Sequence, residues 1–476
     1  MPISFRTMVC AALGLSLALA WGLPARGAPE PELGAAELRV RAQLGPTAAQ
    51  PPEPLPTPAP RPGAVPRRAA APRGLPPTVA PARDAQHAAL GLADLKCLAL
   101  ANHPTLRAAA ARVEAARGAW VQTGLYPNPS AGYIASDVGE GGSAGKQGGF
   151  VTQEFVRGGK LSLNRAAAAG EVFFREQQLA AQRFRVETDV EMQFYEVLAA
   201  RQRLDLIREI ATTAGANVAA AERLLELKEG SRLDLLRART ERDQTTIAVV
   251  GVRQIEMAAW RRLAATVGVP NLTPAPLDGQ LEKVGAPYSF DEARERLLSG
   301  SPELAAARAQ ILRLRRAVDR AEVEPVPNVL ATVMVQRDTF FDEDLVGVQV
   351  GMPLPIYNKN QGAQRQMRAE LAAGQAELGR IELKLQSLLA DVYRRYVTAW
   401  QQVDTYRQRI LPDAKATAAL AQRRYREGED DLKTSLYARR TYLEIQLGYL
   451  TALGELRQSE AELNGLLLSG SLADRP

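Results

Sequence analysis

The chain has 476 residues, of which 46% are hydrophobic and only 5% aromatic, and its formal net charge is +6. Few aromatic residues, together with many Ala, Leu, Arg, Glu and Gln residues, favour long helices over several compact globular domains. The first 90 residues carry nine Lys or Arg against five Asp or Glu, so the remainder has a net charge of about +2. That balance argues against a nucleic-acid-binding surface.

Residues 1–27 are predicted to be a secretory signal peptide. Arg6 supplies the positive n-region, residues 9–19 form the apolar segment, and residues 25–27 provide a small-x-small cleavage site. The apolar segment is too short to span a bilayer as a helix, and no other run of about 18 apolar residues follows. We therefore expect an exported mature chain. Cys97 would be its only cysteine, so no intramolecular disulfide is expected.

Residues 28–89 are predicted to be a disordered spacer, because 13 prolines lie between Pro46 and Pro81 and no apolar face is present. Order is expected to begin near Leu90. The sequence there predicts a helix that is broken at His103-Pro104 and resumes to about Leu125.

Two strand-length segments follow, residues 130–138 and 149–155, separated by the Gly-rich sequence EGGSAGKQGG. After them, residues 160–269 contain no proline. Apolar residues there recur in steps of three and four over about four heptads, which predicts a coiled-coil helix. At about 1.5 Å per residue this helix would be on the order of 100 Å long. The predicted seam residues are Ala200, Leu204, Ile207, Ala211, Ala214, Val218, Ala221 and Leu225.

The chain is predicted to turn back at Gly230, which we expect to take the left-handed conformation just beyond the helix. Ser231 is predicted to be the N-cap of the returning helix. Asp234, three residues later, completes a capping-box pattern. The returning helix is expected to continue to Val267.

The second half repeats the first at an offset of about 200 residues. The predicted divisions are a first repeat (90–268), an inter-repeat linker (269–289), a second repeat (290–468) and a C-terminal tail (469–476). The second repeat has its own strand-length segments, residues 329–337 and 345–353. Its long helix is predicted to have a coiled-coil seam and a single interruption at Pro412. The end of this helix and its turn, residues 421–428, correspond to residues 221–230 of the first repeat. The seam residues are Leu378, Ile381, Leu385, Leu388 and Val392.

Four strands per chain cannot close a membrane barrel, since even the narrowest barrels use about eight. Their length of about nine residues suits tilted membrane-spanning strands. Because open strand edges are not tolerated in lipid, the strands of several copies must join in one barrel, which predicts a cyclic homo-oligomer. The alternative is a soluble four-stranded cap on a coiled coil.

Residues typical of catalysis are sparse. The only histidines are His87, in the spacer, and His103, which precedes a proline. One mature cysteine and two histidines are too few for a Cys/His metal site or nucleophilic pair. The Gly-rich sequence also lacks the terminal GK[ST] of a phosphate-binding loop. The sequence therefore predicts no enzyme, no cofactor and no metal site.

Several motifs together resemble the outer membrane factor family, the TolC-like exit channels of tripartite efflux and type I secretion systems. The resemblance covers about Leu92 to Leu468. It implies a mainly α protein with a small β part: long coiled-coil hairpins and a transmembrane β-barrel, with four strands per protomer and 12 in a trimer. The sequences GLYPNP and GGKLSLNR especially resemble those of the branch that works with cation-efflux pumps of the RND type. The motifs are HPTLRAAAARVEAARG, GLYPNPS, QEFVRGGKLSLNRAAAA, GMPLPIYNKNQGAQR, LELKEGSRLDLLRAR and YREGEDDLKTSLYARR.

The same resemblance places the chain in the outer membrane, in contact with lipid, with a long periplasmic extension. It implies a periplasmic adaptor and an inner-membrane pump as partners. The two hairpin turns would contact the adaptor and form the constriction of the channel. The residues so implicated are Glu229, Gly230, Ser231, Arg232, Leu233, Asp234, Glu427, Gly428, Glu429, Asp430, Asp431 and Leu432.

Some family members carry carboxylates in a DxxDA-like stretch after the second turn. Ala438 matches its alanine, but Thr434 and Tyr437 stand where the carboxylates would be. Other acids lie nearer the turns, and each has an alternative role as a helix cap favoured by the helix dipole. The candidate constriction residues are Asp234, Asp430, Asp431, Thr434 and Tyr437.

The function predicted from these features is that of a passive exit duct of a tripartite efflux system. A type I secretion duct and a periplasmic coiled-coil scaffold without a pore are the alternatives. A scaffold of the adaptor class would be expected to contain a compact β domain, and residues 150–269 contain no candidate for one.

Overall fold

The computed structural model of the protein describes residues 89–139, 144–427 and 429–473. The predicted signal peptide, the predicted spacer up to residue 88, part of the Gly-rich loop, Gly428 and the end of the predicted tail lie outside the described residues. Two compact units are present: residues 133–150 and 333–348 belong to one, and the other described residues form the second. Among the described helices, none combines the length and the apolar composition needed to cross a bilayer.

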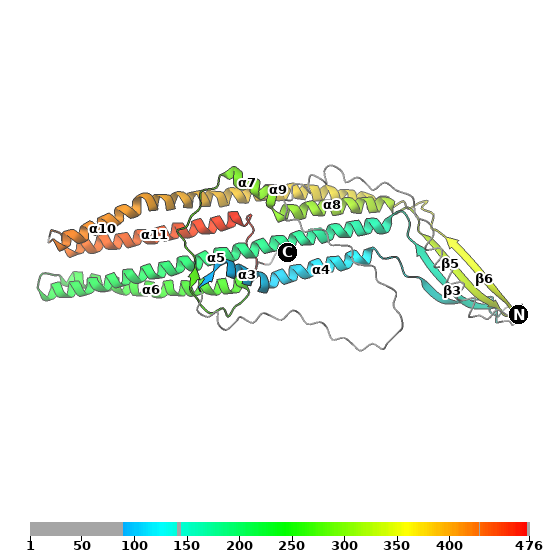
Figure 1. Ribbon diagram of the computed structural model, residues 1–476, viewed down its shortest axis with the longest axis horizontal. Coiled ribbons are helices and arrows are strands. Elements are labelled where there is room, and N and C mark those ends of the chain that lie inside the picture. Colours follow the sequence, from blue (N-terminus) through cyan, green and yellow to red (C-terminus); the bar gives the residue numbers. More distant parts are fainter. Residues whose placement is uncertain (1–88, 140–143, 428, 474–476) are drawn as a thin grey trace. The chain divides into compact units, whose positions relative to one another are not determined.

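The long helix predicted in the first repeat is confirmed. Helix α5, Lys160–Glu226, runs for 67 residues without a break, and α6, Arg232–Val267, returns beside it (Figure 1). All eight predicted seam residues are buried or half-buried. Helix α5 also contacts helices of the second repeat, α8 (Pro302–Val323) and α11 (Leu432–Asn464), so it lies at the centre of the bundle.

Both repeats open with a helix broken by a proline. Helix α3, Leu92–Asn102, ends at His103 and α4, Pro104–Thr123, starts directly after it. In the second repeat α7, Phe290–Gly300, is followed by α8, and the hydroxyl of Ser301 accepts a hydrogen bond from the Leu304 amide. The residue before a proline is pushed to an extended conformation, and His103 and Ser301 both adopt it.

The second long helix is interrupted just before the predicted site. Helix α9, Gln361–Thr405, continues through a π-helical turn, Tyr406–Ile410, into α10, Leu411–Arg426. Pro412 has no amide hydrogen and its ring crowds the carbonyl four residues back, so a widened turn relieves the clash.

The register predicted for this helix was wrong at one residue. Leu388 is 39% exposed, whereas Leu389 is 1% exposed and belongs to the core. The buried residues from Leu385 to Val403 recur in alternating steps of four and three, so the seam continues through Leu389 rather than Leu388.

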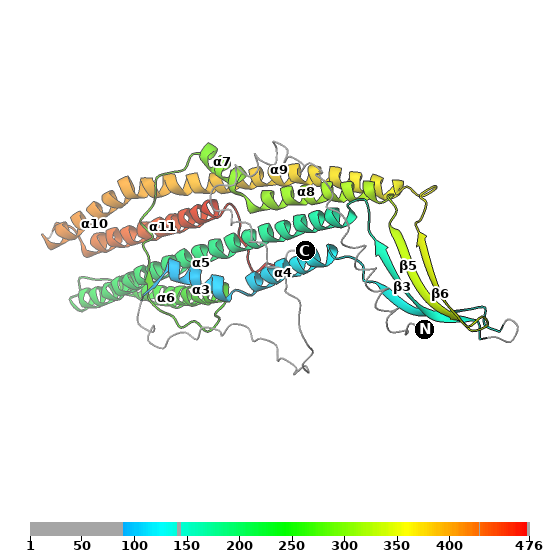
Figure 2. The ribbon, with the colours of Figure 1, turned by 45° about the vertical axis from the view of Figure 1, so that its right-hand side comes forward.

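The strand pairs of the two repeats join in one four-stranded sheet of order β2-β3-β5-β6 (Figure 2). Its strands are β2 (Ser130–Ser136), β3 (Lys146–Phe155), β5 (Val329–Asp338) and β6 (Glu343–Gly351). Strand β3 starts three residues earlier than predicted and includes part of the Gly-rich sequence. Gly148 is required there, because a Cβ atom would lie 1.9 Å from the carbonyl oxygen of Val335 on β5.

The outer strands of this sheet have one neighbour each. Strands β2 and β6 are at its edges, so no described strand pairs with their outer sides. Along β6 and just after it, alternate apolar side chains form an exposed row: Val346, Val348, Val350 and Met352. An open sheet with an exposed apolar face is what the barrel prediction requires of a single protomer.

The inter-repeat linker is more ordered than the sequence suggested. Its β4, Leu277–Asp278, pairs in parallel with β1, Leu90–Gly91, at the start of the first repeat. The indole of Trp260 donates to the carbonyl of Leu272 at 2.9 Å, and Leu281 is fully buried. Isolated hydrophobic residues between prolines and glycines give no periodic signal, so this packing could not be recognised beforehand.

The linker is held to α11 by a buried arginine. The guanidinium of Arg457 donates to the carbonyls of Leu281, at 3.0 Å, and Lys283, and pairs with Glu460 at 2.7 Å. Its side chain is only 6% exposed and lies over the ring of Tyr195, 5.0 Å from the centroid. One side chain therefore satisfies several backbone acceptors that would otherwise be buried without partners.

We expect Arg457→Met to destabilise the protein by about 3–5 kcal/mol, because Glu460 and the linker carbonyls would lose their buried donor. Chemical denaturation and limited proteolysis of the linker would measure this. Arg395→Met is the matched control, since Arg395 is 48% exposed, pairs with Glu462 at 2.6 Å and should cost at most about 1 kcal/mol. Equal losses for the two variants would contradict a special role for Arg457.

Candidate functional site

The first hairpin turn is closed by backbone hydrogen bonds at the end of α5. The amide of Lys228 donates to the carbonyl of Leu225 at 3.0 Å, and the amide of Glu229 donates to that of Leu224 at 3.0 Å. Lys228 has φ 61°, so it takes the left-handed conformation. These are the bonds and the conformation of a Schellman motif with Lys228 at its C′ position.

The prediction that Gly230 takes the left-handed conformation was therefore wrong. Glycine is needed at 230 for another reason, the close approach of the chain to the last turn of α5. A Cβ atom at Gly230 would lie 2.9 Å from Cβ of Leu224 and 3.0 Å from the amide nitrogen of Leu225. The amide of Gly230 also donates to the carbonyl of Leu224 at 2.9 Å.

The second hairpin turn has the same bonds at an offset of 200 residues. The amide of Glu429 donates to the carbonyl of Arg424 at 2.9 Å, as Glu229 does to Leu224. Helix α10 ends at Arg426 and α5 at Glu226, which keeps the same offset. Gly428, which was matched with Gly230 from the sequence, lies outside the described residues.

The returning helices are capped by Ser231 and Asp431. The Ser231 hydroxyl accepts from the Leu233 amide at 3.0 Å, and the Asp431 carboxylate accepts from the Thr434 amide at 2.8 Å. Because Ser231 bonds the Leu233 amide, α6 begins with an N-cap rather than with the predicted capping box to Asp234. The bonds from Thr434, through its side chain and backbone, lower the pKa of Asp431 below its ordinary value.

Most predicted turn residues are accessible to a partner. Those at the first turn, Glu229 to Asp234, are exposed apart from the half-buried Gly230, and Leu233 is 55% exposed. At the second turn Asp430 is half-buried, and α11 starts at Leu432. The other described second-turn and constriction residues are exposed: Glu427, Glu429, Asp431, Thr434 and Tyr437. The two hairpins end on the same side of the helical bundle in both views (Figures 1 and 2).

The acids of the second turn are partly neutralised. Arg424 contacts Glu429 at 3.4 Å and Asp430 at 3.3 Å, so one guanidinium serves two of the candidate carboxylates. Sequence analysis missed Arg424, although its position in the last turn of α10, where cations are favoured, was a usable signal. Of the two adjacent acids, Asp430 is half-buried beside Arg424 and Asp431 is exposed.

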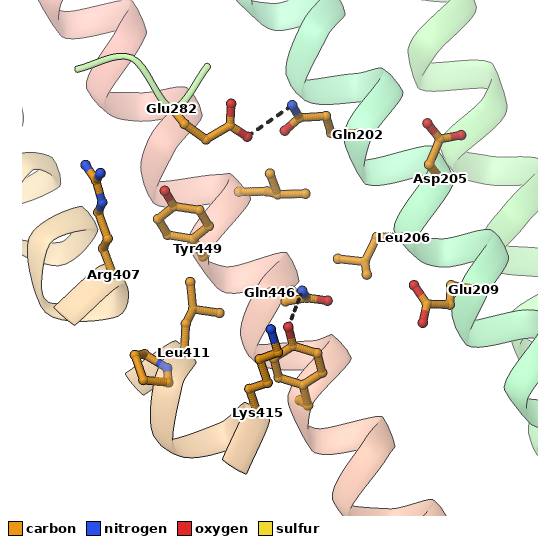
Figure 3. Close-up of a pocket in the computed structure, with 13 residues that line it drawn as sticks. Gln202, Asp205, Leu206, Glu209, Glu282, Arg407, Leu411, Lys415, Gln446 and Tyr449 are labelled. Carbon is orange, nitrogen blue, oxygen red and sulfur yellow. Dashed lines mark hydrogen bonds between the residues drawn. The ribbon is translucent and has the colours of Figure 1, made fainter. Parts of the chain in front are cut away.

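Further along the second hairpin, beside the π-helical turn, lies a pocket of about 620 Å³. Asp205 and Glu209 line it from α5, while Arg407 and Lys415 approach from the opposite side (Figure 3). Glu282 of the linker accepts from Gln202 at 3.3 Å at its edge. Charges of both signs line the pocket, and the described residues contain no group of three or more His, Cys, Asp or Glu residues that could hold a metal ion.

Comparison with known proteins gives a consistent result. A family model described as outer membrane efflux protein matches residues 96–269 and 293–467. The chain is 26% identical over 374 residues to the cobalt-zinc-cadmium resistance protein CzcC of Cupriavidus metallidurans, covering 78% of this chain and 88% of that protein.

Solved structures agree in fold. The open state of the Neisseria gonorrhoeae MtrE outer membrane channel superposes with a TM-score of 0.66 at 16% identity, over 80% of this chain and 89% of that one. The outer membrane protein VceC of Vibrio cholerae gives 0.64 at 18% identity, over 80% and 96%. The fold is that of the TolC-like channels.

We expect Gly230→Ala to destabilise the first turn by about 1–3 kcal/mol, because the added Cβ collides with backbone atoms rather than with a movable side chain. Gly215→Ala, inside α5, is the control. A Cβ there meets nothing within 4 Å, so alanine should be neutral or stabilising by up to about 1 kcal/mol. Thermal unfolding of both variants would measure the difference, and a neutral Gly230→Ala would contradict the close approach.

Proposed function

The chain belongs to the outer membrane efflux protein family, and we propose that it is the exit duct of a tripartite efflux system. In this proposal it conducts substrates passively after an inner-membrane pump delivers them through a periplasmic adaptor. The family is one of efflux ducts in the outer membrane rather than of enzymes. The observation that carries the proposal is the pairing of an open, apolar-faced sheet with two long helical hairpins in one chain.

A homotrimer accounts for the open sheet. Strand β2 of one protomer would pair with β6 of the next, so that three sheets of four strands close one barrel without exposed edges. The exposed row from Val346 to Met352 supports a lipid-facing surface. Exposed apolar residues on α6, among them Ile247 and Val250, support helix contacts between neighbouring protomers.

The two hairpin turns are proposed to contact the adaptor. Their backbone is fixed by the motif bonds at Leu224 and Arg424, while the polar side chains around them remain available. The similarity to a cobalt-zinc-cadmium resistance protein supports metal cations as substrates. An RND-type pump, which the sequence motifs suggest, is proposed as the energy source. A duct of this kind needs no cofactor, because the pump supplies the work.

Native mass spectrometry of the protein in detergent tests the assembly. We expect a trimer that forms conducting channels in planar bilayers, because only three copies supply about a dozen strands, enough for a water-filled barrel. A monomer that conducts by itself, or recovery of the protein wholly in the soluble periplasmic fraction, would refute the duct.

The exposed acids of the second turn are proposed to favour cations at the periplasmic mouth. We expect Asp430→Asn/Asp431→Asn to reduce cation selectivity, since it removes two charges per protomer and frees Arg424 from Asp430. Asparagine still caps helices well, so the trimer yield should not change. The reversal potential of single channels under a salt gradient measures the effect.

The control for this experiment is Asp291→Asn, which removes an exposed charge from the first turn of α7, far along the chain from either hairpin turn. It should leave the reversal potential unchanged. If the double variant behaves like this control, Asp430 and Asp431 act only in ion pairing and helix capping.

A further inference from the structure

A buried histidine lies at the break between α3 and α4. His103 is 0% exposed, although its backbone is extended to accommodate Pro104. It is the only histidine within the described residues, since His87 precedes them. The duct function proposed above makes no use of this side chain.

A chain of hydrogen bonds leads from His103 to the C-terminal segment. Its Nδ1 and the Thr105 hydroxyl are 2.7 Å apart. The amide of Gln182 on α5 donates both to that hydroxyl, at 2.8 Å, and to the carbonyl of Ser471, at 3.0 Å. The imidazole and residue 471 therefore share one polar network.

The same segment is held by a carboxylate of α5. The two oxygens of Asp189 accept from the backbone amides of Gly470, at 2.9 Å, and Ser471, at 2.5 Å. Ser471 is 3% exposed and Leu468 is 2% exposed. Residues 465–471, called here the C-terminal anchor, thus bind the end of the second repeat to the centre of the first (Figure 1).

This network offers no hydrogen-bond acceptor for a proton on Nε2 of His103. Among the described residues, Nε2 of His103 and the hydroxyl oxygen of Ser471 are buried without a hydrogen-bond partner. An imidazolium must donate from both ring nitrogens, so its Nε2 hydrogen would be buried without an acceptor. Burial lowers the pKa of His103, and the charge of Asp189 offsets this effect only in part.

We propose that His103 controls the C-terminal anchor through its protonation: the imidazolium draws Asp189 away from the amides of Gly470 and Ser471, which releases residues 465–471 from α5. Asp189 is the carboxylate whose charge favours the protonated form of His103, and each of its oxygens accepts a hydrogen bond from one of these amides. A carboxylate oxygen can accept more than one hydrogen bond, so the imidazolium competes with the anchor for the charge of Asp189 and weakens the two amide bonds.

Most other charged groups on the packed elements are paired or exposed, while Glu187 of α5 is half-buried. Arg185 of α5 pairs with Glu303 of α8, and Lys96 of α3 pairs with Glu191 of α5 at 2.6 Å. Arg107 of α4 is exposed. These groups leave Asp189 as the partner for which the imidazolium competes with the anchor.

The direction in which pH changes the anchoring equilibrium follows from the lowered pKa of His103. The released state binds a proton more readily than the anchored state, so anchoring is fully present above the ordinary imidazole pKa of about 6.5. As the pH falls below that value, the anchoring equilibrium weakens by up to about tenfold per pH unit, until the buried imidazole itself is protonated.

Hydrogen exchange of the full-length protein in detergent, measured by mass spectrometry between pH 4 and 7.5 and corrected for intrinsic rates, tests this. The protection factors of peptides covering residues 465–473 should be constant above pH 7. Below about pH 6.5 they should fall by up to about tenfold per pH unit. In His103→Gln the loss in this range should be absent. His87→Asn, the matched control, should behave as the parent protein does.

Constant protection of the anchor from pH 7.5 to 5 would overturn the proposal, as would an unchanged loss in His103→Gln. If His103→Gln and His103→Asn both fail to assemble, the pH at which the parent protein loses protection still tests the proposal. A loss that begins only below about pH 4.5 lies in the range where carboxylates titrate and contradicts a role for His103, whereas a loss that begins near pH 6.5 supports it.

Discussion

The exclusion of unpaired strand edges from lipid is the constraint on which the rest of the structure depends. Strands β2 and β6 each leave one edge open, and a membrane offers no water to satisfy it. In the proposed duct, a chain whose described residues contribute four strands to this sheet would therefore assemble with copies of itself in the outer membrane. The duplication in the sequence fits this requirement, because each repeat supplies one strand pair and the helices that support it.

Long-range features of the fold could be predicted from the sequence because they rest on repeated, periodic signals. A proline-free segment with apolar steps of three and four becomes the unbroken α5, and the offset of about 200 residues recurs in the hairpin turns. The strands were located to within three residues. Short alternating segments next to glycine leave their ends undetermined, because the ladder partner decides where a strand begins.

Local details escaped prediction wherever a tertiary contact overrides a residue's usual preference. Glycine is the expected left-handed residue at a helix end, yet Lys228 takes that conformation because Gly230 is needed for the close approach to Leu224. Leu388 and Leu389 are equally apolar, and only the partner helix selects Leu389. In the linker, burial of Leu281 depends on Arg457, which lies far away in the sequence.

The ion pairs along α5 are buried near the middle of the bundle and exposed toward the hairpin turns. Around Arg185 and Glu191 the ion pairs to other helices are largely buried. Toward the turns they are exposed: the Glu209–Arg439 pair is 52% exposed on both sides, and Glu222–Arg239 is similar.

Exposed pairs contribute little free energy, so the ends of the hairpins can rearrange at a small cost while the middle stays fixed. In the proposed duct, a mouth that opens for the adaptor without unfolding the bundle would require this gradient of stability. The linker and the C-terminal anchor both attach to the part of the bundle with buried ion pairs, so they hold the two repeats together there rather than at the turns.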